Sequence, residues 1–354
     1  MKPLRAVSSH DTFAALQLMT QVVDGEVVGF IAAGEIPDSL PTEVEDDVAL
    51  VVESSGSTGT PKRIELPLTA LMHSTAASSA RLGGQGQWLL ALPTNFIAGA
   101  NVLFRSVIAD TQPVIINTRV PFTTDAFIRG ASLMEAPRRY TSLVPAQLAK
   151  LASAAEDDAF VYSMLRKFDA ILVGGQQPNW ADVESLRGKG INVVVSYGMT
   201  ETCGGCVYDG IALEGVGIRL VEGVIEVAGP VLAKGIGEWF STRDLGEIID
   251  GRLQVLGRAD RVIVSGGLKV SLDRVEQAAR EIPGVEQVVA VSIPSSWGES
   301  VGLIYVGSPE AEFSSLADII SEAAKPKKVM RVDQIPELAS GKPDLVRCGQ
   351  LLAE

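Results

Sequence analysis

The sequence predicts an α/β protein with a large N-terminal domain and a small α+β C-terminal domain. Short apolar stretches alternate with helical stretches from about residue 48 to 195, which is typical of mostly parallel sheets flanked by helices. After Tyr197 glycines become dense and short strand-like stretches dominate, which indicates an appended β region. From about Asp260 a new series of strands and helices begins. The length of 354 residues agrees with about two domains.

The large domain is expected to contain the following elements. Strands are expected at residues 48–53, 87–92, 113–116, 140–144, 168–173 and 191–195. Helices are expected at residues 67–82, 124–134 and 145–154. The β region that follows contains strand-like residues 224–228, 247–250 and 253–256.

The C-terminal part begins with a strand-like stretch at residues 261–264. Ser271 is a suitable N-cap for a helix that ends before Pro283-Gly284. Further strands are expected at residues 288–293, 301–306 and 329–332, and a helix at residues 315–324. We place the boundary at residues 257–260, which gives domains of residues 1–257 and 258–354, the second large enough to fold as a unit.

Composition excludes several classes of function. The chain has 30 Lys and Arg against 43 Asp and Glu, a net charge of −13, which argues against nucleic acid as the main partner. No run of 18 apolar residues is present and no apolar stretch follows residues 1–5, so neither a membrane span nor a secretory signal is expected. Three cysteines suggest a reducing, cytoplasmic location. The two histidines, His10 and His73, lie outside any nucleophile motif, so a histidine-dependent hydrolase or metal cluster is not expected.

The strongest single feature is a segment rich in glycine and hydroxyl groups directly after a predicted strand: Ser54-Ser55-Gly56-Ser57-Thr58-Gly59-Thr60-Pro61-Lys62. Glycines let backbone amides turn toward a phosphate, hydroxyls donate hydrogen bonds, and a lysine adds positive charge. The segment differs from a Walker A loop, in which Gly-Lys-Ser/Thr follows four intervening residues. Taken alone, it fits a phosphate-binding loop and a surface turn equally well.

Further motifs follow this loop in a fixed order. They are Val173-Gly174-Gly175-Gln176, Ser196-Tyr197-Gly198-Met199-Thr200-Glu201-Thr202, Ser241-Thr242-Arg243-Asp244, Leu256-Gly257-Arg258-Ala259-Asp260, Val264-Ser265-Gly266-Gly267 and Ser340-Gly341-Lys342. From about residue 50 to its end, the chain resembles the AMP-forming acyl-adenylate synthetases, the superfamily of acyl-CoA ligases, luciferases and peptide-synthetase adenylation domains.

The resemblance implies a reaction in two steps. A carboxylate attacks the α-phosphate of ATP, which releases pyrophosphate and gives an acyl-AMP, and a thiol then displaces AMP. Charge crowding at phosphorus sets the barrier of the first step, so we expect catalysis by electrostatic positioning without a covalent enzyme nucleophile. The implied partners are a small-molecule carboxylate, ATP with Mg²⁺, and CoA. The sequence leaves open whether the chain forms a homo-oligomer.

By family position, the resemblance assigns the phosphates of ATP to three segments. The β- and γ-phosphates would be held by Ser55, Gly56, Ser57, Thr58, Gly59 and Lys62. Thr200 would bond the α-phosphate, and Glu201 would hold Mg²⁺, a cation that prefers carboxylate and phosphate oxygens. Lys342 would bridge the reacting carboxylate and the α-phosphate.

The resemblance assigns the nucleoside to other residues. Tyr197, which precedes Gly198, would stack on the adenine, and Asp244 would accept hydrogen bonds from both ribose hydroxyls. Arg258 would donate to ribose or phosphate, and Asp260 would be the hinge about which a mobile C-terminal domain turns between the two steps. The base edge or the floor of the acyl pocket would be lined by Gly174, Gly175 and Gln176.

Two features depart from the family pattern. About 50 residues precede the phosphate loop, fewer than is usual, so part of the N-terminal subdomain is expected to be absent. Pro343 and Asp344 follow Lys342 where an apolar residue and a polar or basic residue are commoner, which would shift Lys342 slightly.

Two segments, residues 92–105 and 140–148, resemble the o-succinylbenzoate–CoA ligases of menaquinone biosynthesis. o-Succinylbenzoate has two carboxylates, so the one that does not react needs a cationic or hydrogen-bonding anchor, for which Arg105 and Ser142 are the candidates. Phe96 replaces a frequent histidine and would gate the acyl pocket. The resemblance therefore implies an acid–thiol ligase that makes o-succinylbenzoyl-CoA. An Arg105 that faces solvent at a helix end is the alternative.

Other interpretations remain open. Another aryl- or acyl-CoA ligase, or an enzyme that loads a carrier protein, would carry the same motifs, and a nucleotide-binding module without catalysis is a third alternative. Retention of Glu201, Asp244, Arg258 and Lys342 argues against the third. The Cys-x-x-Cys of Cys203 and Cys206 lacks a redox or zinc context, so we expect it to serve packing. The basic cluster Lys325-Pro326-Lys327-Lys328 fits a solvated turn better than a site for the phosphates of CoA.

Overall fold

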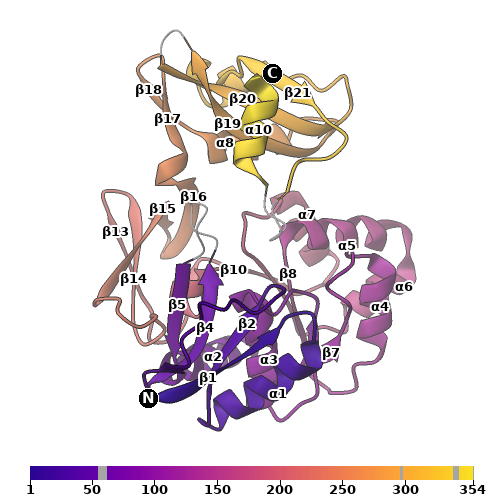
Figure 1. The fold of residues 1–354 in the computed structure, drawn as a ribbon. Helices are drawn as coiled ribbons and strands as arrows, with labels where there is room; N and C mark the ends of the chain where they lie inside the picture. The colour runs from indigo at the N-terminus through magenta and orange to yellow at the C-terminus, as the bar shows by residue number, and fades with distance from the viewer. Residues whose placement is uncertain (55–61, 296–297, 338–342, 354) are drawn as a thin grey trace. The chain divides into compact units, whose positions relative to one another are not determined.

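The structure is a computed structural model that describes residues 1–54, 62–295, 298–337 and 343–353 (Figure 1). It has a mixed α/β fold and divides into two compact units. The first unit comprises Met1–Arg219, Glu226–Phe240 and Asp250–Leu253. The second comprises Leu220–Ile225, Ser241–Ile249 and Gln254–Glu354. The domain boundary at residues 257–260 stays a prediction.

A five-stranded sheet opens the first unit. Its order is β3 (Glu43–Val44), β1 (Lys2–Ser8), β2 (Val28–Ala32), β4 (Val48–Ser54) and β5 (Lys62–Pro67). The strands β1, β2 and β4 are parallel, whereas β5 is antiparallel to β4. Helix α1 (Thr12–Val23) connects β1 to β2 and is capped by the carboxylate of Asp11, which accepts from the Ala14 amide at 2.9 Å. The α/β pattern therefore begins with β1 and not at residue 48.

A seven-stranded sheet forms the centre of the first unit. Its order is β12 (Ile211–Ala212), β11 (Gly204–Tyr208), β10 (Val193–Met199), β9 (Ala170–Gly174), β8 (Arg139–Leu143), β6 (Gln87–Leu90) and β7 (Val114–Ile115). The strands from β10 to β7 are parallel, and only β11 and β12 run antiparallel to their neighbours. The mostly parallel sheet predicted from the sequence is confirmed.

Helices cover both faces of the seven-stranded sheet, as Figure 1 shows. Helices α1, α2 (Leu68–Leu82) and α3 (Ile97–Ile108) share one apolar core with both sheets. The second face carries α4 (Thr124–Ser132), α5 (Pro145–Asp157), α6 (Ala159–Leu165) and α7 (Trp180–Gly188). Strands buried on both faces need apolar residues on both sides, which explains the continuous apolar stretches in the sequence.

The β region forms a four-stranded sheet of β13 (Gly217–Val221), β14 (Val224–Ala228), β15 (Trp239–Ile249) and β16 (Arg252–Arg258). The expected strands 247–250 and 253–256 correspond to the parts of the longer β15 and β16 that lie next to the connecting turn. They meet at Asp250 and Gly251, whose φ angles of 50° and 74° suit a two-residue hairpin turn.

The second unit contains a further sheet. Its strands are β17 (Val262–Ser265), β18 (Leu268–Ser271), β19 (Val285–Ser295), β20 (Gly298–Gly307) and β21 (Lys328–Arg331). Helices α8 (Leu272–Arg280) and α9 (Leu316–Ile319) pack on one face, and α10 (Leu345–Ala353) packs on the other. Ser271 caps α8, as predicted, by accepting from the Arg274 amide.

One predicted helix is wrong in length. The helix expected at residues 315–324 consists of α9 and a separate 3-10 turn at Glu322–Ala324. Ser321 between them has an extended backbone, with φ of −177° and ψ of 162°, so the helical hydrogen bonds cannot continue through it.

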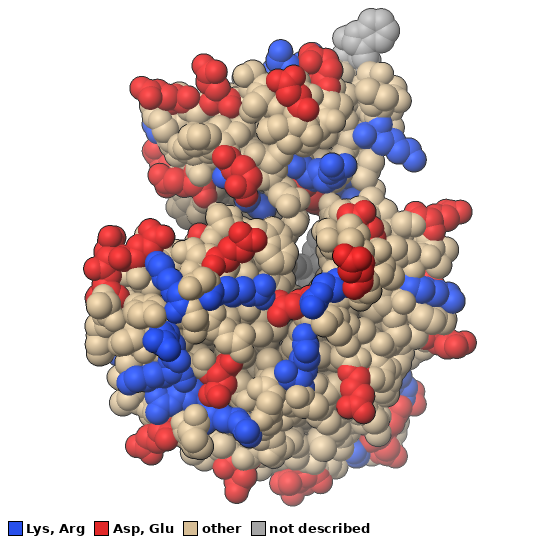
Figure 2. Space-filling model, turned by 180° about the vertical axis from the view of Figure 1, so that it is seen from behind, with Lys and Arg blue, Asp and Glu red and all other residues tan. Residues whose placement is uncertain are grey.

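Acidic and basic side chains are interspersed on the face drawn in Figure 2. Within the described residues, no helix has both the length and the apolar character needed to cross a membrane. On this face the charges of both signs are mixed, so the net charge of −13 does not by itself locate a ligand-binding site.

Gly99 on α3 provides a test of packing around that helix, with Gly188 at the end of α7 as the control. A Cβ at Gly99 would lie 2.2 Å from the carbonyl oxygen of Pro93, whereas a Cβ at Gly188 would meet nothing within 4 Å. We expect Gly99→Ala to destabilise the chain by about 1–3 kcal/mol, because backbone must move to accept the methyl group. Gly188→Ala should be neutral or stabilise by up to about 1 kcal/mol, since alanine favours helix. Thermal unfolding midpoints measure both, and an unchanged midpoint for Gly99→Ala would contradict the packing described.

Candidate active site

Two predicted nucleotide-binding segments lie side by side where the parallel strands β9 and β10 end. Gly174 pairs with Ser196 in the sheet, and a Cβ at Gly174 would lie 2.6 Å from the Ser196 carbonyl oxygen. Gly175 follows with φ of +83°, and Gln176 is exposed. The ends of parallel strands are the usual place for ligands in α/β sheets, so this edge is the first candidate for the site.

A tight turn after β10 places Thr200 and Glu201. Gly198 has φ of +159°, and a Cβ there would lie 2.0 Å from the carbonyl oxygen of Gly204, so glycine is required. The hydroxyl of Thr202 accepts from the Met199 amide at 3.0 Å and donates to the Gly204 carbonyl at 2.7 Å. These bonds hold the 3-10 turn Thr200–Thr202 directly at the end of the strand.

Lys62 and Glu201, which are far apart in the sequence, line the same cavity of about 210 Å³. The wall is completed by Arg63, Ile64, Glu65, Ala233, Lys234, Gly235, Ile236 and Phe240. The Ala233 amide donates to the Glu201 carbonyl at 2.8 Å, and the Lys234 amide donates to the Glu65 carbonyl at 2.9 Å. These bonds fix the strand bearing Lys62 and the turn bearing Glu201 against one segment.

The charges in this cavity differ in their partners. The ammonium of Lys234 forms ion pairs with Glu45 at 2.7 Å and Asp47 at 2.5 Å. The hydrogen bond that it donates to Asp47 lowers the pKa of that carboxyl group. Within the described part of the chain, Lys62 and Glu201 have no ion-pair partner. An ammonium and a carboxylate that face one cavity without partners suit an anionic ligand and a cation, respectively.

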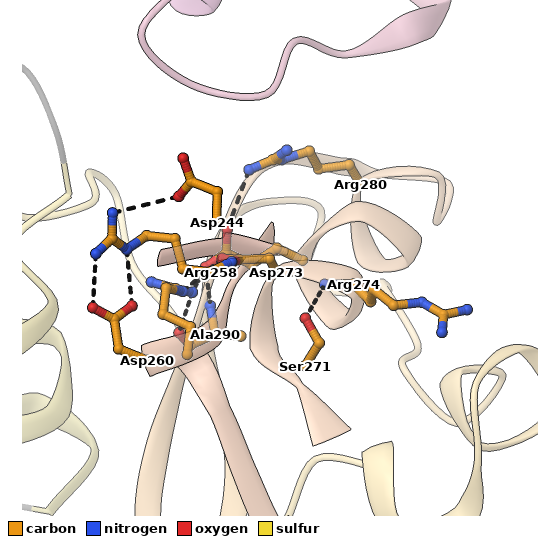
Figure 3. A network of polar contacts seen from close by, with 10 residues as sticks. Asp244, Arg258, Asp260, Ser271, Asp273, Arg274, Arg280 and Ala290 are labelled. Carbon is orange, nitrogen blue, oxygen red and sulfur yellow. Dashed lines mark hydrogen bonds and ion pairs between the residues drawn. The ribbon is translucent and has the colours of Figure 1, made fainter. Parts of the chain in front are cut away.

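The second unit brings Asp244, Arg258 and Asp260 together, as Figure 3 shows. The guanidinium of Arg258 donates to both carboxylate oxygens of Asp260, at 2.8 and 2.7 Å, and its Nη1 lies 3.5 Å from Asp244. Arg258 thereby lowers the pKa of Asp260, mainly through these hydrogen bonds. The resemblance assigns all three residues to the nucleotide site or the hinge, but it does not predict that they pair with one another.

A second group of charges behind Arg258 escapes prediction from the sequence. The carboxylate of Asp273, on α8, accepts from the Arg258 amide at 2.6 Å and forms an ion pair with Arg261. Glu276, one turn later on α8, pairs with Arg261 and Arg280 and accepts from the backbone of β19. Burial raises the pKa of Glu276. The spacing of two acidic residues on α8 is the only local signal for this network.

Helix α3 carries the predicted acyl-pocket residues. Phe96 is its N-cap residue, with φ of −98° and ψ of 148°, and is half-buried. Arg105 lies in the last turn of α3 and is only 5% exposed, so it does not face solvent. Its Nη2 donates to the hydroxyl of Tyr208 at 3.4 Å, and its Nε is buried and has no hydrogen-bond partner among the described residues.

Other residues of this region lie apart from Arg105 or escape prediction. Ser142 is buried on β8, where it pairs with Leu172. Within the described residues it forms no hydrogen bond with Arg105. Asn101, one turn before Arg105, donates to the Cys203 carbonyl at 2.9 Å and thus ties α3 to the turn after β10. Asn101 and Arg105 are polar residues four apart in an apolar helix, a spacing that could have identified a buried polar stripe.

Several predicted residues lie outside the described residues. They are Lys342 and the phosphate-loop residues Ser55, Gly56, Ser57, Thr58 and Gly59. The residues that flank them are described. Lys62 begins β5, and Ser54 ends the antiparallel β4 opposite it. Asp344 caps α10 by accepting from the Arg347 amide at 3.0 Å, which gives this unusual residue a structural role.

Known proteins identify the family to which these features belong. The model of the AMP-binding enzyme family matches residues 6–232, more than half of the chain. The chain belongs to the AMP-binding enzyme family. The mixed α/β fold agrees with the solved structures that match the chain.

Relatives of this AMP-binding enzyme have more specific names. A probable 2-succinylbenzoate–CoA ligase from Mycobacterium tuberculosis is 37% identical over 97% of this chain and 96% of the relative. The o-succinylbenzoate CoA synthetase of Bacillus subtilis with its acyl-adenylate intermediate matches with a TM-score of 0.75 and 24% identity, over 97% of this chain and 82% of that one. The same enzyme with ATP and magnesium ion matches with a TM-score of 0.73 and 25% identity, over 94% and 76%.

The thiols of this AMP-binding enzyme are placed for packing. Cys203 and Cys206 are fully buried beside the Thr200–Thr202 turn, and burial raises the pKa of each thiol to about 12. Cys348 is buried against the sheet of the second unit, and burial raises its pKa as well. In the described part of the chain, no group of three or more His, Cys, Asp or Glu residues could hold a metal ion.

A thiol reagent tests this burial. A pKa of about 12 leaves roughly one thiol in ten thousand ionised at pH 8, and only the thiolate reacts. We expect Ellman's reagent at pH 8 to label none of the three cysteines in the folded enzyme within minutes, and all three in guanidinium chloride. Rapid labelling of Cys203 or Cys206 in the folded chain would contradict the burial of these thiols.

Proposed function

We propose that the chain is an acid–thiol ligase that activates o-succinylbenzoate and transfers it to CoA. One carboxylate of the substrate attacks the α-phosphate of ATP, and pyrophosphate leaves with the electrons of the broken P–O bond. The thiol of CoA then attacks the acyl carbon, and AMP leaves to give o-succinylbenzoyl-CoA. The similarity to the Mycobacterium tuberculosis relative along 97% of the chain supports this reaction and a place in menaquinone biosynthesis. Three free thiols support a cytoplasmic location.

The burial of Arg105 without an anionic partner among the described residues is the observation that supports this substrate. A buried guanidinium is costly unless an anion compensates it, and an unpartnered N–H adds to that cost. Arg105 has neither a carboxylate partner within the described residues nor a hydrogen bond at Nε. A substrate with a second carboxylate would supply both. Phe96, at the start of the same helix, lies roughly 13 Å away along the helix axis, at 1.5 Å per residue, and would gate entry of the acyl group.

The Lys62–Glu201 cavity fits the phosphates and Mg²⁺. Mg²⁺ usually binds one or two carboxylates together with substrate phosphates, and Glu201 supplies a carboxylate beside the lysine that would contact the phosphates. When bound, Mg²⁺ would neutralise charge on the phosphate oxygens. The hydroxyl of Thr200 would bond the α-phosphate, and the loop from Ser55 to Gly59 would hold the β- and γ-phosphates.

The nucleoside would lie along the ends of β9 and β10. Tyr197, next to Gly198, would stack on the adenine, and the base edge would be lined by Gly174, Gly175 and Gln176. Asp244 would bind the ribose hydroxyls. Arg258 would then donate to ribose or phosphate, which requires it to share or give up its bonds to the hinge residue Asp260.

An assay of ATP–pyrophosphate exchange with a panel of carboxylic acids tests this function directly. We expect ATP–pyrophosphate exchange that depends on o-succinylbenzoate and Mg²⁺, followed by formation of the CoA thioester, because both carboxylates are needed to fill the site. The panel includes benzoate and fatty acids as controls. Exchange with the controls but not with o-succinylbenzoate would contradict the substrate and favour another aryl- or acyl-CoA ligase. No exchange with any acid would contradict an enzyme function.

Lys342→Ala tests the role of the late lysine. Loss of a positive charge from the crowded transition state should lower the rate of adenylate formation by about 10²–10³-fold, with little change in ATP binding. Lys327→Ala, which removes an exposed lysine of the same unit, serves as the control. Rapid-quench measurement of adenylate formation gives the rate. Equal rates for Lys342→Ala and the unmodified enzyme would contradict the assignment.

A further inference from the structure

Arg105 is held in place by residues from two strands of the seven-stranded sheet. Its Cζ lies 5.0 Å from the ring centroid of Trp88 on β6, and its Nη2 donates to Tyr208 on β11 at 3.4 Å. Both aromatic residues are buried, with exposed fractions of 3% and 0%. One ring face and one hydroxyl therefore position the guanidinium, which is attracted to the electron-rich face of the indole.

The chemistry of arginine determines the direction of its bond to Tyr208. A guanidinium only donates, so the Tyr208 oxygen accepts from Arg105. The Tyr208 hydroxyl shares a second hydrogen bond with Ser78 on α2, whose Oγ lies 2.8 Å away and is also buried, and either hydroxyl can be the donor. Hydrogen bonds thus link Arg105 to Tyr208 and Tyr208 to Ser78, and the Nε of Arg105, which has no partner among the described residues, is available to a ligand.

The two aromatic rings are themselves fixed. Gly205 leaves room for Tyr208, since a Cβ there would lie 2.9 Å from the Tyr208 ring. Trp88 packs against the ring of Tyr140, with 5.1 Å between centroids. The Tyr140 hydroxyl donates away from Arg105, to the carbonyls of Leu82 at 3.1 Å and Gly84 at 3.0 Å. Among the described residues, Tyr140 therefore packs against Trp88 and forms no hydrogen bond with the guanidinium of Arg105.

We propose that Tyr208, backed by Ser78, and Trp88 are positioning residues that hold Arg105 ready for the second carboxylate of the acyl substrate. The proposal rests on the proposed function, in which Arg105 anchors that carboxylate. A free arginine side chain would lose rotamer freedom when it binds substrate. Because Arg105 is already held by its neighbours, that entropy is lost on folding, and the KM for the substrate is lower.

Tyr208→Phe is the test, with Tyr140→Phe as its matched control. Each variant removes the hydrogen-bonded hydroxyl of one buried tyrosine, so each should lower the thermal unfolding midpoint. Tyr208→Phe should also raise the KM for o-succinylbenzoate about tenfold, whereas kcat and the KM for ATP change less than about twofold. Tyr140→Phe should leave all three kinetic values unchanged. If Tyr208→Phe does not fold, Ser78→Ala replaces it, with a smaller rise in the same KM.

Arg105→Lys, measured in the same assay, separates this proposal from the proposed function. A large rise in the KM for o-succinylbenzoate with Arg105→Lys, together with an unchanged KM with Tyr208→Phe, would overturn the positioning role and leave the anchor intact. Equal rises with Tyr208→Phe and Tyr140→Phe would overturn it too, because the cause would be lost packing. An unchanged KM with Arg105→Lys would contradict the anchor itself.

Discussion

Burial of both faces of the seven-stranded sheet is the constraint on which the site depends. Helices α1, α2 and α3 cover one face and α4 to α7 cover the other, so polar residues have room mainly at the ends of the strands. Gly174, Gly198 and the Thr200–Thr202 turn lie at those ends, where backbone passes close to backbone and larger residues do not fit. The predicted nucleotide-binding motifs therefore lie at the edge that the fold leaves available to a ligand.

Arg105 differs from the other buried polar residues of this unit, such as Asn101 and Ser142, because it carries a charge inside the covered layer. Its neighbours Trp88 and Tyr208 compensate part of the cost of burial, through a ring face and one hydrogen bond, but they supply no negative charge. The rest of the compensation is assigned to the substrate in the proposed function. In that proposal the site is selective, since a ligand without a second carboxylate would leave the guanidinium uncompensated.

The sequence allows prediction of those features that depend on local chemistry. The parallel strands follow from apolar stretches and the helix α8 from its Ser271 cap, whereas the roles of the nucleotide segments are implied by the resemblance to the acyl-adenylate synthetases and stay predictions. Features that depend on distant residues could not be predicted. The meeting of Lys62 with Glu201, the burial of Arg105 under Tyr208 and the Arg261–Glu276 network all join segments whose proximity is set by the tertiary fold. The β1–α1–β2 unit cannot be predicted in this way, because no motif marks it.

A crystal structure of the enzyme with an unreactive analogue of the o-succinylbenzoyl adenylate would test the central claim most directly. We expect the free carboxylate of the analogue to lie within about 3 Å of the Nε of Arg105, with Trp88 and Tyr208 still in contact with the guanidinium. A carboxylate bound elsewhere, with Arg105 unchanged and Nε still without a partner, would contradict it.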